Sequence, residues 1–325
     1  MTSLCPLGLD VAKRTFAAAI LLSEGRTRHR QFANSPAGFT ALAAWLRAHA
    51  TAQLHAGLEA TGTNGDALAL FLHHTGVRVS VINPLRIHAF AKSELARNKT
   101  DPLDAALIAR FVATQQPRAW TPPPPEQRQL QALVRRVEAL QAMRQAEHNR
   151  LDLESADSPL AESLRAHLAH LDEQLCQLHQ RLRDHLHTHP ALQQQSALLQ
   201  SIPGIGATTA LKLLAEMPGL AERPSARQVA AYAGLNPAHR ESGSSVRGRS
   251  HLSKIGNARL RRALYLPAVV AMRHNPLLRD FAARLRDRHK APMVVVAAVM
   301  RKLLHQAYGV LKHRTPFNPR YVPAH

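Results

Sequence analysis

Hydrophobic positions in the first third of the chain alternate between strand-like and helix-like patterns. Short apolar runs at residues 4–10, 15–22 and 27–32 predict three strands in an antiparallel meander. Helical and strand patterns then alternate, in the order helix 35–49, strand 54–59, helix 65–75, strand 77–82, helix 84–96 and a last helix from Thr100–Asp101 to Val112. Strands that alternate with helices favour a mixed sheet covered by helices on its faces. We therefore predict an α/β domain over residues 1–118.

A proline-rich segment and two long helical patterns follow. Residues 119–126 read AWTPPPPE, which cannot continue a helix and favours extended backbone, so we place a domain boundary there. Leucines then recur at 4-3 spacing from Leu164 to Leu182, a heptad seam. Residues 155–159 interrupt the two helical patterns as a loop. The range 119–197 is thus predicted to be a helical hairpin, or one arm of an intermolecular coiled coil.

The remaining residues, 198–325, read as an all-helical domain. The segment 202–214, IPGIGATTALKLL, has the form of a helix-hairpin-helix turn, in which Gly204 and Gly206 let backbone amides approach a phosphate. The alternative is a glycine-rich cap with an apolar helix behind it. A short helix is expected at 225–233, with Ser225 as N-cap and Gly234 as C-cap. Tyr232 and Tyr265 are expected in the helical core.

The net charge of the chain limits the kinds of molecule that it is expected to bind. The chain has 42 Lys and Arg against 22 Asp and Glu, a net charge of +20, while its 45% of hydrophobic residues excludes a disordered polycation. A folded basic surface favours nucleic acid first and an acidic membrane surface second. No apolar run reaches the ~18 residues of a spanning helix, and no signal peptide is evident. We expect a soluble protein of the cytoplasm or nucleoid, without a disulfide or zinc site from Cys5 and Cys176.

Four carboxylates occupy positions that topology brings together. Asp10 and Glu59 each close a predicted strand, whereas Asp101 and Asp104 share a face at the start of a helix. Clustered carboxylates repel one another unless cations neutralise them, and hard oxygen ligands select Mg²⁺ or Mn²⁺. Two such ions stabilise the attacking and leaving oxygens of a phosphodiester displacement. Singly, Asp101 and Asp104 also fit a helix N-terminus, through the dipole or a capping box.

Three motifs around these acids carry a family resemblance. LGLDVAK at 7–13, GLEATG at 57–62 and NKTDPLDAALIARF at 98–111 resemble the ribonuclease-H-like, RuvC-type DEDD domain of the insertion-sequence transposases of family one-ten, and Piv-type DNA invertases are similar. The resemblance implies that Asp10, Glu59, Asp101 and Asp104 bind Mg²⁺. It covers the whole predicted first domain.

The C-terminal region is the most basic part of the chain. Residues 240–290 contain 13 Lys and Arg against 3 Asp and Glu. These charges flank the small-residue loop 241–249, ESGSSVRGR, rather than alternating with acids as on a solubilising helix. We therefore expect contacts with nucleic acid from the basic side chains around this loop, namely Arg247, Arg249, Lys254, Arg259 and Arg262.

A serine in this loop is the candidate nucleophile. GLNP at 234–237, ESGSS at 241–245 and KIGNARLRRALY at 254–265 resemble the C-terminal domain of the same transposases, where a serine in the Ser-Gly step attacks DNA. That position corresponds to Ser242, although Ser244 and Ser245 stand close enough to compete for the role. A serine hydroxyl needs activation by a metal, a base or nearby cations.

These features predict a DNA transposase or recombinase. Strand exchange on donor and target DNA requires duplexes held symmetrically, so we expect a homodimer or homotetramer. The resemblance also implies a structured guide RNA encoded by the element. Two alternatives remain open: a RuvC-like nuclease that hydrolyses DNA junctions with Ser242 as a structural residue, and a non-catalytic nucleic-acid-binding protein.

Overall fold

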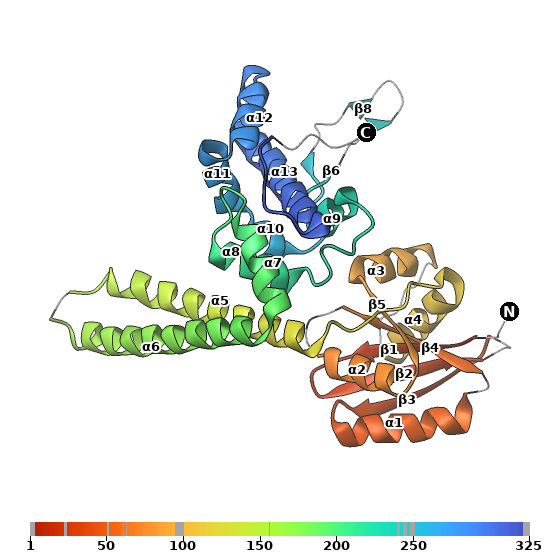
Figure 1. The fold of residues 1–325 in the computed structure, drawn as a ribbon. Coiled ribbons are helices and arrows are strands. Elements are labelled where there is room, and N and C mark those ends of the chain that lie inside the picture. The colour runs from red at the N-terminus through yellow and green to blue at the C-terminus, as the bar shows by residue number, and fades with distance from the viewer. Residues whose placement is uncertain are drawn as a thin grey trace. The chain divides into compact units, whose positions relative to one another are not determined.

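The computed structural model describes residues 4–22, 25–50, 52–60, 62, 64–94, 101–155, 157–238, 241–242, 246–247 and 251–320, with the side chains of 101, 102, 241, 242, 246 and 247 left aside. The chain divides into two compact units, Met1–Pro122 and Pro123–His325, and the division falls inside the proline-rich segment (Figure 1). Each unit is described by itself.

The first unit is built on a five-stranded mixed sheet in the order β3-β2-β1-β4-β5. Its strands are β1 (Leu4–Val11), β2 (Thr15–Leu21), β3 (Thr27–Ala33), β4 (Gln53–Glu59) and β5 (Arg78–Ile82). The first three are antiparallel neighbours, whereas β1, β4 and β5 run parallel. The predicted meander and mixed α/β class are therefore confirmed.

Helices cover both faces of this sheet. The helices are α1 (Pro36–His49), α2 (Asp66–His74), α3 (Pro84–Ser93) and α4 (Asp101–Gln115). Ser35 caps α1 by accepting a hydrogen bond from the Gly38 amide. Leu7 and Leu9 of β1 point into the cluster formed with α1 and α2. Because side chains alternate along a strand, Gly8 and Asp10 face the opposite side, which α4 covers.

Small residues let α4 lie very close to the sheet. A Cβ on Gly8 would stand 1.9 Å from the carbonyl oxygen of Ala105 and 2.4 Å from the amide nitrogen of Ala109. A Cβ on Gly57 would meet Val112 Cγ2 at 2.4 Å. The helix backbone thus occupies the space that side chains would fill at these strand positions.

A buried histidine ties β4 to β5. His55 is 1% exposed, and its Nε2 lies 2.8 Å from the hydroxyl of Ser80. Burial, and then the charge of Arg78, lower the pKa of His55 to about 4. His55 is therefore neutral at physiological pH and serves the sheet as a hydrogen-bonding core residue.

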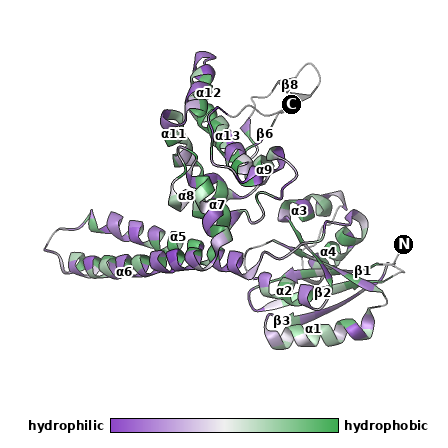
Figure 2. Ribbon diagram, in the orientation of Figure 1, coloured by the Kyte–Doolittle hydropathy of each residue, from purple (hydrophilic) through white to green (hydrophobic). Residues whose placement is uncertain are grey.

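The second unit begins with two long antiparallel helices, α5 (Pro125–Leu151) and α6 (Pro159–Thr188), which lie side by side (Figure 1). Arg144 of α5 pairs with Asp172 of α6. Most of the predicted heptad leucines of α6 are buried, while both helices carry hydrophilic residues along much of their length (Figure 2). The hairpin is thus observed within one chain, and a role in assembly stays a prediction.

Shorter helices and two small ladders complete the second unit. The helices are α7 (Pro190–Gln200), α8 (Ala207–Glu216), α9 (Ala226–Tyr232), α10 (Ala258–Ala263), α11 (Tyr265–His274), α12 (Pro276–Asp287) and α13 (Pro292–His313). The ladders pair β6 (Pro237–Ala238) with β9 (His251–Leu252), and β7 (Glu241–Ser242) with β8 (Val246–Arg247). One hydrophobic cluster runs from Leu130 of α5 to Leu311 of α13, so the ranges 119–197 and 198–325 share a core.

The helix α13 is long and apolar enough, by length and composition, to cross a membrane. Of its apolar window, 56% is buried inside the protein. Val299, Leu303 and Leu304 have no exposed surface and belong to the core of the second unit. A core helix of this kind passes the same test of length and hydropathy.

The close approach of α4 predicts unequal costs for two glycine substitutions. We expect Gly8→Ala to lower the free energy of unfolding by about 3 kcal/mol, because its methyl group overlaps helix backbone that can move only with the whole helix. Gly57→Ala should cost about 1–2 kcal/mol, because the atoms it meets are ends of side chains that can shift. Urea denaturation followed by circular dichroism measures both. Equal costs, or no cost for Gly8→Ala, would contradict this packing.

Candidate functional site

Two of the predicted acids are neighbours on adjacent parallel strands. Strand β1 pairs with β4 in a register that ends at Leu9 opposite Leu58. One step further, Asp10 stands beside Glu59, on strands that are about 4.8 Å apart. Both side chains are half-buried, and each has a polar or electrostatic partner in the structure.

The third acid reaches the same region through α4. Gly8 and Gly57 lie two residues before Asp10 and Glu59, so both acids point to the sheet face covered by α4. Asp104 directly precedes Ala105, the residue that contacts Gly8. Ala105 also packs against Ala17, the cross-strand partner of Asp10. The first turn of α4 therefore lies near the strand ends that carry Asp10 and Glu59.

The donor chemistry of this region fits a hard divalent cation. Asp10, Glu59 and Asp104 offer only carboxylate oxygens, the ligands that Mg²⁺ and Mn²⁺ prefer. Asp101 begins α4, but its side chain lies outside the described residues. Among the side chains that the structure describes, no three acids, histidines or cysteines are gathered closely enough to hold an ion as they stand. The four-carboxylate metal site stays a prediction.

Ser242 belongs to the small ladder of β7 and β8, which comes between β6 and β9 in the sequence. Its backbone pairs with Val246, and Glu241 pairs with Arg247. The side chains of Ser242 and Arg247 lie outside the described residues, as do Ser244, Ser245 and Arg249 entirely. The choice among the three serines therefore stays open.

The segment that contains Ser242, here called the serine segment, is flanked by two stems, residues 232–238 and 251–257. Backbone hydrogen bonds hold these stems together. The Ser253 amide donates to the Asn236 carbonyl, and the Asn257 amide donates to the Tyr232 carbonyl at 2.7 Å. Gly256 has a φ of +147°, and a Cβ there would stand 2.4 Å from the Tyr232 carbonyl oxygen. Only glycine combines this backbone conformation with so close an approach. The GLNP and KIGN motifs thus form the paired stems of one segment.

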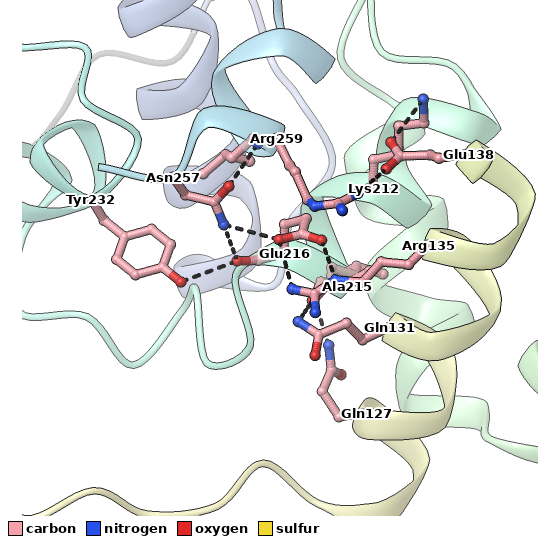
Figure 3. A network of polar contacts seen from close by, with 12 residues as sticks. Gln127, Gln131, Arg135, Glu138, Lys212, Ala215, Glu216, Tyr232, Asn257 and Arg259 are labelled. Carbon is pink, nitrogen blue, oxygen red and sulfur yellow. Dashed lines mark hydrogen bonds and ion pairs between the residues drawn. The ribbon is translucent and has the colours of Figure 1, made fainter. Parts of the chain in front are cut away.

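A buried carboxylate anchors these stems to the rest of the unit (Figure 3). Glu216, the last residue of α8, is 3% exposed, and Arg135 of α5 donates to both of its carboxylate oxygens. Asn257 donates to the same carboxylate at 3.0 Å and caps α10 through its own oxygen. Desolvation raises the pKa of Glu216, but the hydrogen bonds from Arg135 and Asn257 and the charges of Arg135 and Arg259 outweigh it and lower that pKa below its usual value.

The final carbonyl oxygens of α8 are satisfied by the same set of neighbours. A helix end leaves such oxygens without partners inside the helix. Here side chains from α5, α9 and the loop before α10 donate to them: Gln127 to Leu214, Gln131 to Ala215, and Tyr232 and Asn257 to Glu216. This hydrogen-bond network therefore connects α5 and α8 to both stems of the serine segment.

The predicted nucleic-acid contacts fall into two groups. Lys254 and Arg262 are exposed. Arg259 is also exposed and forms an ion pair with Glu138 at 3.0 Å, while Lys212 pairs with the same carboxylate at 3.1 Å. The contacts of these residues with nucleic acid stay predictions. Gly204 turns toward α11, where a Cβ would meet Ala271 at 2.7 Å. Gly206 is the exposed N-cap of α8 with open space around it.

Sequence reasoning missed several residues of these sites and misplaced two. Gly8, Gly57, Glu216 and Asn257 were not predicted, although the spacing of two between each glycine and its acid was a usable signal. The expectation that Tyr232 and Tyr265 are core residues is wrong, since they are 37% and 40% exposed. The Tyr232 hydroxyl donates to Glu216, and its ring lies under Arg223.

The anchoring role of Glu216 gives a stability prediction. We expect Glu216→Gln to lower the free energy of unfolding by about 1–3 kcal/mol at pH 7, because charged hydrogen bonds become neutral ones in a buried place. Glu138→Gln is the matched control, with an expected cost below about 1 kcal/mol for its more exposed pair. Urea denaturation measures both.

The pH dependence of this difference provides a second check. The pKa of Glu216 is lower in the folded than in the unfolded chain, so its contribution is present above the unfolded value of 4.5 and is lost as the pH falls below it. The gap between wild type and Glu216→Gln should therefore narrow in acid. A gap that widens in acid would contradict the assignment.

The sequence matches two transposase families in consecutive parts. Residues 7–153 match a family described as transposase, of the DEDD type found in IS110 elements. Residues 196–283 match the transposase family of IS116, IS110 and IS902. The first match contains the four predicted acids, and the second contains Ser242 with both stems of its segment.

Relatives extend the match over the whole chain. The pilin gene-inverting protein of Moraxella bovis is 34% identical over 317 residues, which cover 97% of this chain and 98% of that protein. The corresponding protein of Moraxella lacunata has the same identity and coverage. A 43.6 kDa protein of insertion element IS110 from Streptomyces coelicolor is 32% identical over 162 residues, 50% of this chain and 38% of that protein. The chain therefore belongs to the IS110-type transposases and pilin-gene invertases, a family of DNA recombinases.

Proposed function

We propose that the protein cleaves and rejoins DNA strands in a reaction that depends on Mg²⁺, or on Mn²⁺ in its place, and proceeds through a covalent serine–DNA intermediate. Asp10, Glu59, Asp101 and Asp104 would hold the metal, and Ser242 would be the nucleophile. The observation that carries the proposal is the placement of Asp10 beside Glu59 on the face covered by α4, whose first turn contains Asp104.

The proposed chemistry is a balanced exchange of phosphodiester bonds. The Ser242 hydroxyl gives up its proton and attacks phosphorus, while the bond from phosphorus to a deoxyribose oxygen breaks and that oxygen takes up a proton. One ester replaces another, so a hydroxyl of a second strand can reverse the step and join new partners. Bound Mg²⁺ would supply the positive charge that stabilises the attacking and leaving oxygens.

The two halves of this chemistry lie in different units. Asp10 belongs to the first unit and Ser242 to the second, so the proposed reaction requires both units to act on one phosphodiester, from one chain or from two. Strand exchange on donor and target DNA also requires symmetry, which supports a homodimer or homotetramer. The leucine seam of α6 is the element we propose for assembly.

The proposed partners follow from the relatives and from charge. The names of the relatives refer to gene inversion and to insertion elements, which supports DNA as the substrate. The net charge of +20 with 4% aromatic residues suits recognition of phosphates and folded shape, which fits a structured guide RNA encoded by the element. A cytoplasmic, nucleoid-associated location follows from these partners.

The test is a denaturing gel of the purified protein with Mg²⁺, the flanking RNA of its element and labelled donor and target DNA. We expect a covalent protein–DNA adduct with the wild type that is lost in both Ser242→Ala and Asp10→Ala. Ser244→Ala and Ser245→Ala are the matched controls and should retain the adduct.

Two outcomes would overturn the proposal, and a third would assign the nucleophile to another serine. Cleavage without an adduct that survives Ser242→Ala would indicate a nuclease in which the acids activate water. Binding without cleavage, unaffected by chelation of Mg²⁺, would indicate a non-catalytic nucleic-acid-binding protein. An adduct that is lost only in Ser244→Ala or Ser245→Ala would move the nucleophile to that position.

A further inference from the structure

A groove of about 870 Å³ lies in the second unit at the base of the serine segment. Pro237 of β6 and Leu252 of β9, one from each stem, line it. Tyr265 at the start of α11 and Met293 and Val294 at the start of α13 line it from the helical side. Tyr265 is 40% exposed and Met293 is 62% exposed, so apolar and aromatic surface is open to solvent there.

The charges around this groove have one sign. Its lining includes Lys254, Arg261, Arg262 and Arg301, together with His251, and contains no acid among the residues that the structure describes. Lys254 and Arg262 are exposed. Arg261 is held in place, because its Nη1 donates to the Ala233 carbonyl at 3.0 Å. A cationic rim therefore surrounds an apolar floor.

We propose that this groove binds an unpaired nucleotide of the DNA strand beside the phosphate that the protein cleaves. The base would lie against Tyr265 and the apolar side chains, and Lys254, Arg262 and Arg301 would contact its phosphates. The proposal rests on the proposed function, because the stems that form the groove carry Ser242. Because Ser242 is proposed to attack a DNA phosphodiester, the nucleotide next to the reacting phosphorus belongs to DNA rather than to RNA.

Charge complementarity favours a nucleotide over a second protein chain in this groove. A second copy of this chain carries a net charge of +20, so it offers a groove lined by cations and no described acid less charge complementarity than the phosphates of a nucleic acid do. Single-stranded nucleic acid needs the opposite combination, a basic groove along its backbone with aromatic or apolar faces on which bases stack. The size of the groove also lies within the range of small-molecule sites, about 300–1,000 Å³.

Photocrosslinking of the full-length protein tests this assignment. The probe is a single-stranded DNA of mixed sequence that carries one 5-iododeoxyuridine, and Ser242→Ala protein is used so that covalent chemistry at the serine does not interfere. Irradiation followed by peptide mapping should place the crosslink on the peptide that contains Tyr265. Tyr265→Ala should lose this crosslink and weaken binding about tenfold, whereas Tyr265→Phe should retain both.

Matched controls separate the groove from its surroundings. Leu266→Ala alters the adjacent residue, which is 69% exposed and does not line the groove, and it should leave the crosslink unchanged. Arg262→Gln should reduce the slope of log affinity against log salt by about one. Arg288→Gln, an exposed arginine at the end of α12, should not change the crosslink at Tyr265.

Three results would overturn the inference. A DNA crosslink that maps elsewhere, or that persists in Tyr265→Ala, would remove the nucleotide from the groove. A Tyr265 crosslink with the matching RNA but not with DNA would assign the groove to RNA. A change of oligomeric state in Met293→Asp, with no DNA crosslink at Tyr265 in the wild-type groove, would make it a protein interface. Because the assay uses Ser242→Ala protein, its outcome is independent of whether Ser242 is the nucleophile.

Discussion

The candidate site depends on the close contact between α4 and the sheet at Gly8 and Gly57, two positions without side chains. Side chains at these two positions would hold the helix farther from the sheet. Here a Cβ on Gly8 would stand 1.9 Å from the Ala105 carbonyl oxygen, so the helix backbone rests on the strand backbone. Because side chains alternate along a strand, Asp10 and Glu59 point to the same face as these glycines. The position of Asp104 therefore follows from the absence of two side chains.

In the second unit, a buried carboxylate connects the stems of the segment that contains Ser242 to the surrounding helices. A buried carboxylate is costly, and Glu216 is stable in its place because Arg135, Asn257 and the helix end share one set of hydrogen bonds. Through Asn257 and Tyr232 the network reaches both stems of the serine segment. The hydrogen bonds at the stems thus hold in place the two ends of the segment in which we propose that Ser242 attacks DNA.

The strands, and the positions of Asp10 and Glu59 near their ends, could be predicted because their signals are local. Asp10 and Glu59 end apolar runs, and parallel neighbours place such ends together. The glycines were missed because their role appears only when α4, about a hundred residues after Gly8, is laid on the sheet. Glu216 was missed for the same reason, since Arg135 and Asn257 are 81 and 41 residues away. The number of charges in a segment does not reveal ion pairs with distant residues, such as the pair between Arg259 and Glu138. The prediction that Tyr265 lies in the helical core was wrong, because helical spacing does not reveal which face of a helix other elements cover.

The central claim is that the acids on the α4 face act together on a divalent ion. The most direct measurement is electron paramagnetic resonance of Mn²⁺ with the DNA-bound protein, which distinguishes bound from free ion. Glu59→Gln removes one proposed ligand, and Glu94→Gln removes an exposed acid of the same unit that pairs with Arg110. We expect bound Mn²⁺ in the wild type and in Glu94→Gln, and its loss in Glu59→Gln. Equal Mn²⁺ binding by all three proteins would contradict it.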